Sequence, residues 1–193
     1  MKLYTKYVKV FDTLMVGFSN KPVTSSEKKD NKEILFNDKE IIGVNIFNPQ
    51  IDKDKKYLLE DSELSQYCVS EIKDIIKIEN IENQFVVAKV EECEPIEGTH
   101  LSLCKVNDGK ELIQIVCGAK NVRKGSFTCL ATIGSFMPNG MQILKGKLKG
   151  FESFGMLCSL KELGYENPKY NNEGIVELEV DDSQIGKSVW EVL

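Results

Sequence analysis

The sequence predicts an α+β protein in which a small N-terminal α+β domain precedes a five-stranded antiparallel β-barrel. Two observations predict this division. Residues 1–78 combine several short strand patterns with one helical pattern. From Phe85 onward, short apolar strands alternate with turn signals, which is typical of a closed or half-closed antiparallel barrel. We therefore place the N-terminal domain at 1–78, a polar linker at 79–84 and the barrel domain at 85–193.

The N-terminal domain is expected to contain a few strands and one helix. The β-forming residues of 1–19 indicate two strands joined by a turn near Asp12. Residues 20–32 are polar and charged, and we expect a loop there. Two further strands are expected at 33–36 and 40–47, followed by a helix at 62–78 with Ser62 as its N-cap. The role of this domain stays open, because it shows neither a nucleophile–base pair nor a phosphate-binding glycine loop.

The barrel domain shows a regular succession of strands and turns. The expected strands are 85–93, 101–106, 112–116, 127–133 and 141–148. The turn signal Asn107-Asp108-Gly109 separates the second strand from the third. Beyond the barrel we expect a short helix at 159–163, a late strand at 175–180, and a cover for one barrel end at 184–193.

Composition points to an ordinary globular protein. The chain has 193 residues, of which 41% are hydrophobic and 28% charged, with a net charge of −5. No apolar run approaches the roughly 18 residues of a membrane span, and charges at Lys6, Lys9 and Asp12 interrupt the N-terminus where a signal peptide would be apolar. We expect a cytoplasmic protein without a membrane partner. Because neither half of the chain is basic, any nucleic-acid site must be a local patch.

Cysteine and histidine usage argues against metal and catalytic sites. The six cysteines form no C-x-x-C pair, and His100 is the single histidine. Most of the cysteines lie in apolar runs, so we interpret them as buried thiols. We therefore expect no metal, no other cofactor and no catalytic residues, which means that the protein is not an enzyme.

A lysine-rich stretch at 144–157 is the most informative segment. Lys145, Lys147 and Lys149 alternate with other residues and are expected to share one face of a strand. Gly150 and Gly155 then bracket an expected turn that carries aromatic, hydroxyl and thioether side chains. This combination suits an RNA backbone and an unstacked base. The alternative is a solvated edge strand whose lysines prevent aggregation.

Two motifs carry a resemblance to a known family. The first is Gln114–Ala119 with Asn121, Val122 and Gly125, and the second is Lys149-Gly150, Ser153, Gly155–Ser159 and Glu162–Gly164. Together they resemble the two signatures of the tRNA-binding domain of the EMAP II and YtpR type. The resemblance covers residues 85–190, and the length of the whole chain is similar to that of free-standing YtpR proteins. It implies an OB-fold and tRNA binding that depends on structure and is largely independent of sequence. The same module occurs in the phenylalanyl-tRNA synthetase β subunit.

The resemblance also assigns candidate RNA-binding residues. It favours a phosphate contact at Lys149 and implies an RNA-facing hydroxyl at Ser153, with a turn-stabilising hydroxyl as the alternative. Met156 is a candidate base contact, with core packing as the alternative. Lys147, Lys145 and Arg123 are further candidates for phosphate contact, against solvated side chains. We expect Asn121 to brace its loop through bonds to the backbone.

One segment departs from the family pattern. Where the family has a cation entering its second strand, this chain has His100, with Glu94 and Glu97 nearby. This departure weakens the expected RNA surface and motivates a second hypothesis, an interaction scaffold that docks on a synthetase or another protein partner. The oligomeric state stays open, with a homodimer as one outcome, since small free-standing relatives are often dimers.

Overall fold

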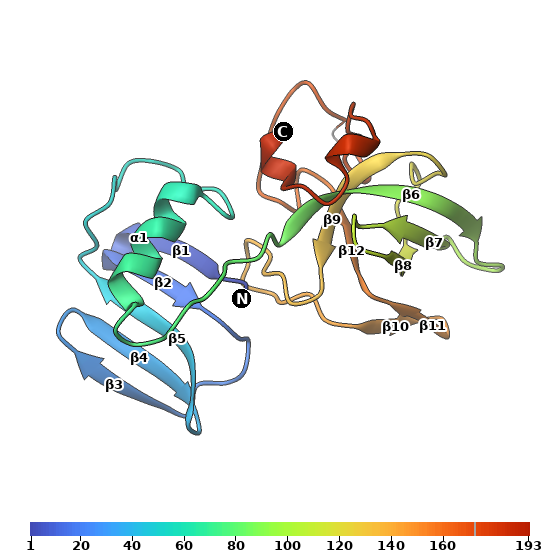
Figure 1. The fold of residues 1–193 in the computed structure, drawn as a ribbon. Helices are drawn as coiled ribbons and strands as arrows, with labels where there is room; N and C mark the ends of the chain where they lie inside the picture. Colours follow the sequence, from blue (N-terminus) through green and yellow to red (C-terminus); the bar gives the residue numbers. More distant parts are fainter. Residues whose placement is uncertain (172) are drawn as a thin grey trace. The chain divides into compact units, whose positions relative to one another are not determined.

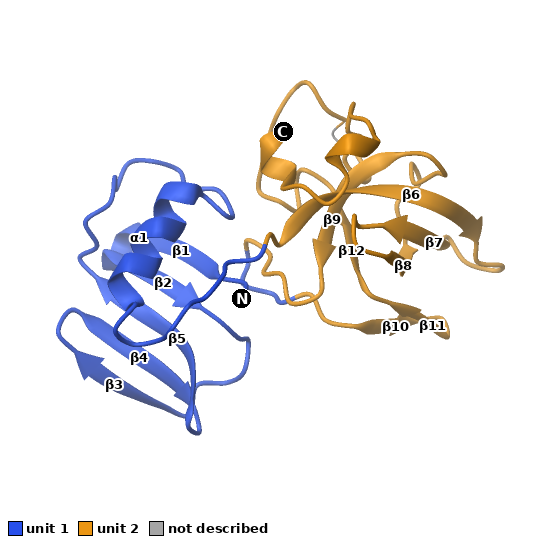
Figure 2. Cartoon of the chain, viewed as in Figure 1, with its two compact units in different colours: residues 1–82, 139–142 blue, residues 83–138, 143–193 orange. Residues whose placement is uncertain are grey.

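The computed structural model describes residues 1–171 and 173–193, which form two compact units (Figure 2). Unit 1 comprises Met1–Glu82 together with Asn139–Gln142, and unit 2 comprises Asn83–Pro138 and Ile143–Leu193. Strands predominate, and the described residues contain one α-helix, α1. Within these residues no helix has the length and apolar character needed to cross a membrane.

Unit 1 is a five-stranded antiparallel sheet with α1 on one face (Figure 1). The strand order is β1-β2-β5-β4-β3. The elements are β1 (Tyr4–Val8), the 3-10 turn η1 (Lys9–Phe11), β2 (Thr13–Gly17), β3 (Ser25–Lys29), β4 (Lys32–Asn37), β5 (Glu40–Phe47) and α1 (Ser62–Ile72). The turn expected near Asp12 is present, and Asp12 takes a left-handed backbone with φ of 42°.

The helix of unit 1 differs from its predicted bounds. It ends at Ile72 rather than at Ile78, and its N-cap is Asp61, whose carboxylate accepts a hydrogen bond from the Leu64 N–H at 3.0 Å. Leu64, Cys68 and Ile72 are buried against Leu14, Val16, Val44 and Ile46 of the sheet. The apolar residues beyond Ile72 prolong the helical pattern in the sequence, but they pack against this core from a turn.

The loop expected at 20–32 contains an edge strand. Strand β3 (Ser-Ser-Glu-Lys-Lys) pairs with β4 along its whole length, and all five of its residues are exposed. Because β3 contains no apolar residue, its sequence lacks the apolar–polar alternation that would indicate a strand. Its charges fit the edge position, where lysines oppose pairing with other chains.

Unit 2 contains a second five-stranded antiparallel sheet, in the order β12-β9-β6-β7-β8. Its strands are β6 (Phe85–Pro95), β7 (Ser102–Asn107), β8 (Leu112–Cys117), β9 (Phe127–Thr132) and β12 (Gly155–Cys158). The buried core includes Val90, Val106, Ile115, Leu130 and Leu157. The sheet curls, and its order is compatible with an OB-like fold.

The segment after β9 differs from the strand expected at 141–148. Only β10 (Gly146–Leu148) is regular, and it pairs with β11 (Phe151–Ser153) in a separate two-stranded hairpin (Figure 1). Strand β11 lies where a turn was expected between Gly150 and Gly155, and the fifth strand of the curled sheet is β12, which begins at Gly155. The Phe154 N–H donates to the Gln114 carbonyl at 2.9 Å and Gln114 Nε2 donates to the Glu152 carbonyl at 2.8 Å, so the 152–154 segment covers the outer edge of β8.

The last part of unit 2 is mostly irregular. Residues 159–163 form turns rather than the expected helix, and 175–180 is extended but is not a strand of either sheet. Its backbone nevertheless docks on the curled sheet, because the Val176 N–H donates to the Cys158 carbonyl at 2.9 Å. The 3-10 turns η2 (Asp182–Gln184) and η3 (Val189–Glu191) follow, and Trp190 of η3 meets Phe85 edge to face at 6.0 Å between ring centroids.

Candidate nucleic-acid interface

The β10–β11 hairpin carries the predicted lysines, but it does not place all three on one strand face. Lys147 lies in β10, Lys145 precedes that strand, and Lys149 lies in the two-residue turn with Gly150. The expectation of one shared strand face is therefore wrong for Lys149, because the chain reverses direction there. The turn instead presents Lys149 at the tip of the hairpin, where it is exposed.

The backbone at Lys149 is unusual for a lysine. Its φ is +49°, in the left-handed region that costs most side chains about 1 kcal/mol or more. Gly150 has a φ of +91°, so both turn residues have positive φ, as the favoured two-residue hairpin turns require. Among the described non-glycine residues, the others with positive φ are Asp and Asn, which tolerate it, and Glu60. Strain of this kind is often retained at functional positions.

The three lysines differ in their partners. Lys145 Nζ lies 2.7 Å from Glu152 Oε1 and 4.8 Å from the centroid of the Phe154 ring. Lys147 and Lys149 make no ion pair or hydrogen bond with any part of the chain that the structure describes. These two ammonium groups are therefore available to an anionic ligand, whereas Lys145 must first leave a carboxylate.

Ser153 is built into the junction between the hairpin and the curled sheet. It is only 5% exposed. Its Oγ accepts a hydrogen bond from the Val116 N–H at 3.1 Å and donates one to the Gly155 carbonyl at 3.2 Å. This geometry favours the turn-stabilising role over a direct contact, and the RNA contact of Ser153 stays a prediction.

Two apolar side chains share the face of the hairpin on which Ser153 lies. Leu148 and Phe151 are direct cross-strand partners beside the turn, and they are 45% and 38% exposed. Side chains of directly opposed residues lie close together on one face. An exposed aromatic ring therefore stands next to the unpaired Lys149. The sequence did not reveal this exposed pair, because the residue type of a single apolar position does not show whether its side chain is exposed or buried in the core.

Gly155 allows the chain to pass from the hairpin into the curled sheet. Its φ is +149°, and a Cβ at this position would lie 2.9 Å from the Ala131 carbonyl oxygen and 3.0 Å from Leu130 Cδ1. A side chain would therefore push β12 away from β9. The requirement for glycine explains this position of the second motif without any ligand.

Met156 is half-buried and lines a hollow that joins the two sequence motifs. The hollow lies between the end of β8, with Gly118 and Ala119, and the segment that contains Lys161 and Glu162. Lys161 is exposed and makes no ion pair with the described residues, so it is a cation that the sequence reasoning missed. Its only signal was its place between Ser159 and Glu162 of the second motif.

The loop after Gly118 is held by Asn121. Its Nδ2 donates to the Ile175 carbonyl at 2.8 Å, and its Oδ1 accepts from the Ile175 N–H at 3.0 Å. These are the backbone bonds expected of Asn121, although they reach a segment distant in sequence. The same loop carries Arg123, whose Nη2 lies 2.7 Å from Glu177 Oε2. The Arg123 guanidinium, followed by the Asn121 amide, lowers the pKa of the Glu177 carboxyl. Arg123 is therefore already paired, and its RNA contact stays a prediction.

His100 lies beside the first motif. Its imidazole is adjacent to Gly118, because a Cβ built on that glycine would lie 3.6 Å from His100 Nε2. The departure from the family pattern thus falls at the edge of the hollow that Met156 lines. A histidine there is not the permanent cation that a lysine or arginine would be, and it supplies less attraction for phosphate.

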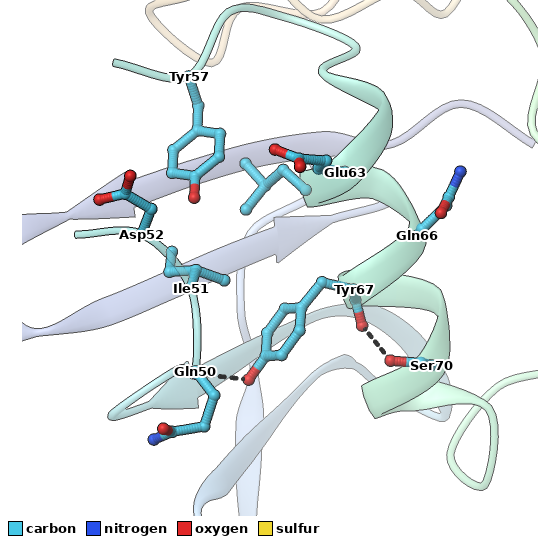
Figure 3. Close-up of a pocket in the computed structure, with 9 residues that line it drawn as sticks. Gln50, Ile51, Asp52, Tyr57, Glu63, Gln66, Tyr67 and Ser70 are labelled. Atoms are coloured by element: carbon cyan, nitrogen blue, oxygen red, sulfur yellow. Dashed lines mark hydrogen bonds between the residues drawn. The ribbon is translucent and has the colours of Figure 1, made fainter. Parts of the chain in front are cut away.

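A second hollow, in unit 1, is lined by the 50–57 segment and α1 (Figure 3). The Gln50 N–H donates to the Tyr67 hydroxyl at 2.9 Å across it. Asp52 accepts bonds from the Asp54 and Lys55 N–H groups, and Glu63 pairs with Lys55. Because its acidic groups are already engaged and no unpaired cation lines it, we place the candidate interface in unit 2.

Comparisons with known proteins agree with this placement. Residues 85–187 match the model of the family described as "Putative tRNA binding domain". The chain is 35% identical over 189 residues to "Putative tRNA-binding protein YtpR" of Bacillus subtilis, a match that covers 89% of this chain and 91% of that protein. It is 36% identical over 191 residues to "Uncharacterized protein MG449 homolog" of Mycoplasma pneumoniae, covering 92% of this chain and 79% of the other.

A third relative is much longer than this chain. The "Phenylalanine--tRNA ligase beta subunit" of Ehrlichia canis is 40% identical over 132 residues, which is 64% of this chain but only 17% of the subunit. The matched family covers more than half of the chain, and both YtpR-sized relatives align over most of their length. The chain therefore belongs to the "Putative tRNA binding domain" family.

Proposed function

We propose that this protein is a non-catalytic tRNA-binding protein, in which a five-stranded OB-fold barrel at 85–193 recognises tRNA by shape and backbone charge. Membership of the family and the printed name of the Bacillus subtilis relative support tRNA as the ligand. The absence of a catalytic role is supported by His100, which makes no hydrogen bond within the part of the chain that the structure describes.

The observation that carries the proposal is the tip of the β10–β11 hairpin. Lys149 is exposed and unpaired in the turn, flanked by the exposed Leu148 and Phe151, and Lys147 is exposed and unpaired on the opposite face of the hairpin. Lysines bind phosphate as point charges, and an exposed aromatic ring stacks on a base that has left its helix. The hairpin therefore offers both contacts that an unpaired nucleotide in a structured RNA requires.

The number of unpaired cationic side chains determines the expected affinity for tRNA. Glu152 and Glu177 already neutralise Lys145 and Arg123, and the chain carries a net charge of −5. Few phosphates are then neutralised on binding, which corresponds to a micromolar-class, salt-sensitive affinity of about 10⁻⁶ to 10⁻⁴ M. Binding should be clear at low salt and much weaker at moderate salt.

Filter binding of bulk tRNA at low and moderate salt tests the proposal. We expect retention at low salt and a steep loss at moderate salt. A Lys149→Glu variant should bind more weakly, whereas Lys28→Glu, which changes the same charge on the exposed strand β3 of unit 1, should bind like the wild type. A lack of retention by the wild-type protein at low salt would rule out tRNA binding.

A protein-interaction scaffold is the second candidate. The exposed Leu148–Phe151 pair and the ion pair that occupies Arg123 favour it, because an apolar pair also suits a protein surface. Surface plasmon resonance against a purified aminoacyl-tRNA synthetase separates the candidates. If the wild-type protein binds the synthetase, Phe151→Ala abolishes that binding and Lys149→Glu leaves tRNA retention unchanged, the scaffold is the better description.

A further inference from the structure

Two cysteines of unit 2 face each other across neighbouring strands. Cys93 of β6 and Cys104 of β7 are direct cross-strand partners, and their sulfur atoms are 3.7 Å apart. Cys104 is fully buried, whereas Cys93 is half-buried near the end of β6. The pair therefore has one sulfur near the surface and one in the core.

The backbone already satisfies the main requirement for a disulfide. Directly opposed residues of antiparallel strands have Cα atoms about 4.5–5.5 Å apart, and disulfides bridge Cα separations of about 4.4–6.8 Å. The sulfur atoms must approach to about 2.05 Å. Rotation of the two side chains about their Cα–Cβ bonds is the movement that would close that gap.

We propose that Cys93 and Cys104 form a modification site that hydrogen peroxide oxidises to an intramolecular disulfide. In the first step Cys93 sulfur attacks the peroxide, its O–O bond breaks, and sulfenic acid and water form. In the second step Cys104 sulfur attacks Cys93 sulfur, which expels the hydroxyl. The hydroxyl takes the Cys104 proton and leaves as a second water. The two thiols are oxidised and the hydrogen peroxide is reduced.

The environments of the two thiols fit this order. Burial, followed by the adjacent Cys93, raises the pKa of the Cys104 thiol. A buried thiol of raised pKa is a poor first nucleophile toward peroxide, because the thiolate is the reactive form. Cys104 is therefore suited to be the resolving thiol rather than the thiol that meets the oxidant.

The Cys93–Cys104 disulfide would form next to the first sequence motif. Cys93 Sγ donates a weak hydrogen bond to the Val122 carbonyl at 3.8 Å, in the loop that Asn121 braces. Rotation of Cys93 toward Cys104 removes this contact. Cys117, at the end of β8, is the competing partner for Cys93. Burial is the main cause of the raised pKa of the Cys117 thiol, and the nearby Cys93 is a smaller cause.

Tryptic mapping after oxidation tests the proposal. The full-length protein is treated with hydrogen peroxide, blocked with iodoacetamide in denaturant and cut with trypsin. Cleavage after Lys89 and Lys105 leaves both cysteines in one peptide, 90–105. We expect this peptide to be two hydrogen atoms lighter and unalkylated, and dithiothreitol to restore alkylation at both cysteines. Further cleavage after Glu97 should give two fragments, one with each cysteine, still joined by the disulfide.

Two controls keep the outcome decisive. Cys93→Ala should leave Cys104 alkylated after the same treatment, and circular dichroism checks that this half-buried position tolerates the change. Two results would overturn the proposal. One is a crosslink between peptides 90–105 and 111–120, which would assign the bond to Cys117. The other is complete alkylation of all six cysteines after oxidation.

Discussion

The chain contains two lysine-bearing hairpins that differ in how they are built. The β3–β4 hairpin of unit 1 carries Lys28 and Lys29 and belongs to a five-stranded sheet. The β10–β11 hairpin of unit 2 carries Lys147 and Lys149 and forms a separate two-stranded sheet. The first has Asp30 as its left-handed turn residue, whereas the second has Lys149. A charged edge and a candidate binding tip therefore differ in turn chemistry and attachment, although both carry lysines.

Charge reversal on the two hairpins should give the largest contrast. The double change Lys147→Glu and Lys149→Glu is expected to lower tRNA affinity by about tenfold or more and to reduce the salt slope by about two, because two phosphate contacts are lost. Lys28→Glu with Lys29→Glu makes the same charge change on the other hairpin and should have little effect. Filter binding across a salt series measures both. Equal losses for the two pairs would show that only net charge matters.

Removal of the aromatic ring should have the next largest effect. Phe151→Ala is expected to weaken tRNA binding by about 1–3 kcal/mol, the usual contribution of one stacked base. Phe151→Trp retains a flat ring and should bind at least as well as the wild type. The comparison is made at low salt, where phosphate contacts are strongest. If the alanine variant binds tRNA normally, Phe151 does not touch a base.

The serines of the two hairpins should differ in their contribution to stability. Ser153→Ala leaves the part-buried Val116 N–H without its acceptor and should lower the free energy of unfolding by about 1 kcal/mol. Ser26→Ala removes an exposed bond to Glu33 and should change it by less than about 0.5 kcal/mol. Urea unfolding followed by circular dichroism compares them, and Trp190 fluorescence reports on unit 2 alone. A neutral Ser153→Ala would contradict the bracing role.

The turn residues should give the smallest effect. Lys149→Asn places a residue that tolerates positive φ where the β3–β4 turn already has Asp30. We expect the free energy of unfolding of unit 2 to rise by about 0.4–1 kcal/mol, while tRNA binding weakens. Thermal unfolding and filter binding on the same variant separate the two consequences. A gain in stability without any loss of binding would show that Lys149 is not a contact.

Local patterns were enough to predict much of the curled sheet. Strands β6 to β9 are short segments rich in apolar residues, separated by strong turn signals such as Asn107-Asp108-Gly109, so their positions follow from the sequence. Strand β3 has no apolar residue, and its pairing with β4 is what makes it a strand. The expected strand at 141–148 is longer than β10 because apolar residues also occur outside strands.

The candidate site was predictable in its location and less so in its geometry. The glycine positions and the lysines pointed to 144–157, but three properties depend on distant partners. Ser153 is buried and accepts a hydrogen bond from Val116. Lys145 is paired with Glu152, and Arg123 is paired with Glu177. A single sequence does not show which charges meet in space.

The most direct measurement is hydrogen–deuterium exchange of the full chain with and without tRNA. If tRNA binds the tip of the β10–β11 hairpin, amide exchange should slow in peptides covering 145–154 and stay unchanged in those covering 25–37, the β3–β4 hairpin. The Lys149→Glu variant should lose the slowing at equal tRNA concentration. Bound tRNA that leaves exchange at 145–154 unchanged, or that slows the two hairpins alike, would contradict the proposed interface.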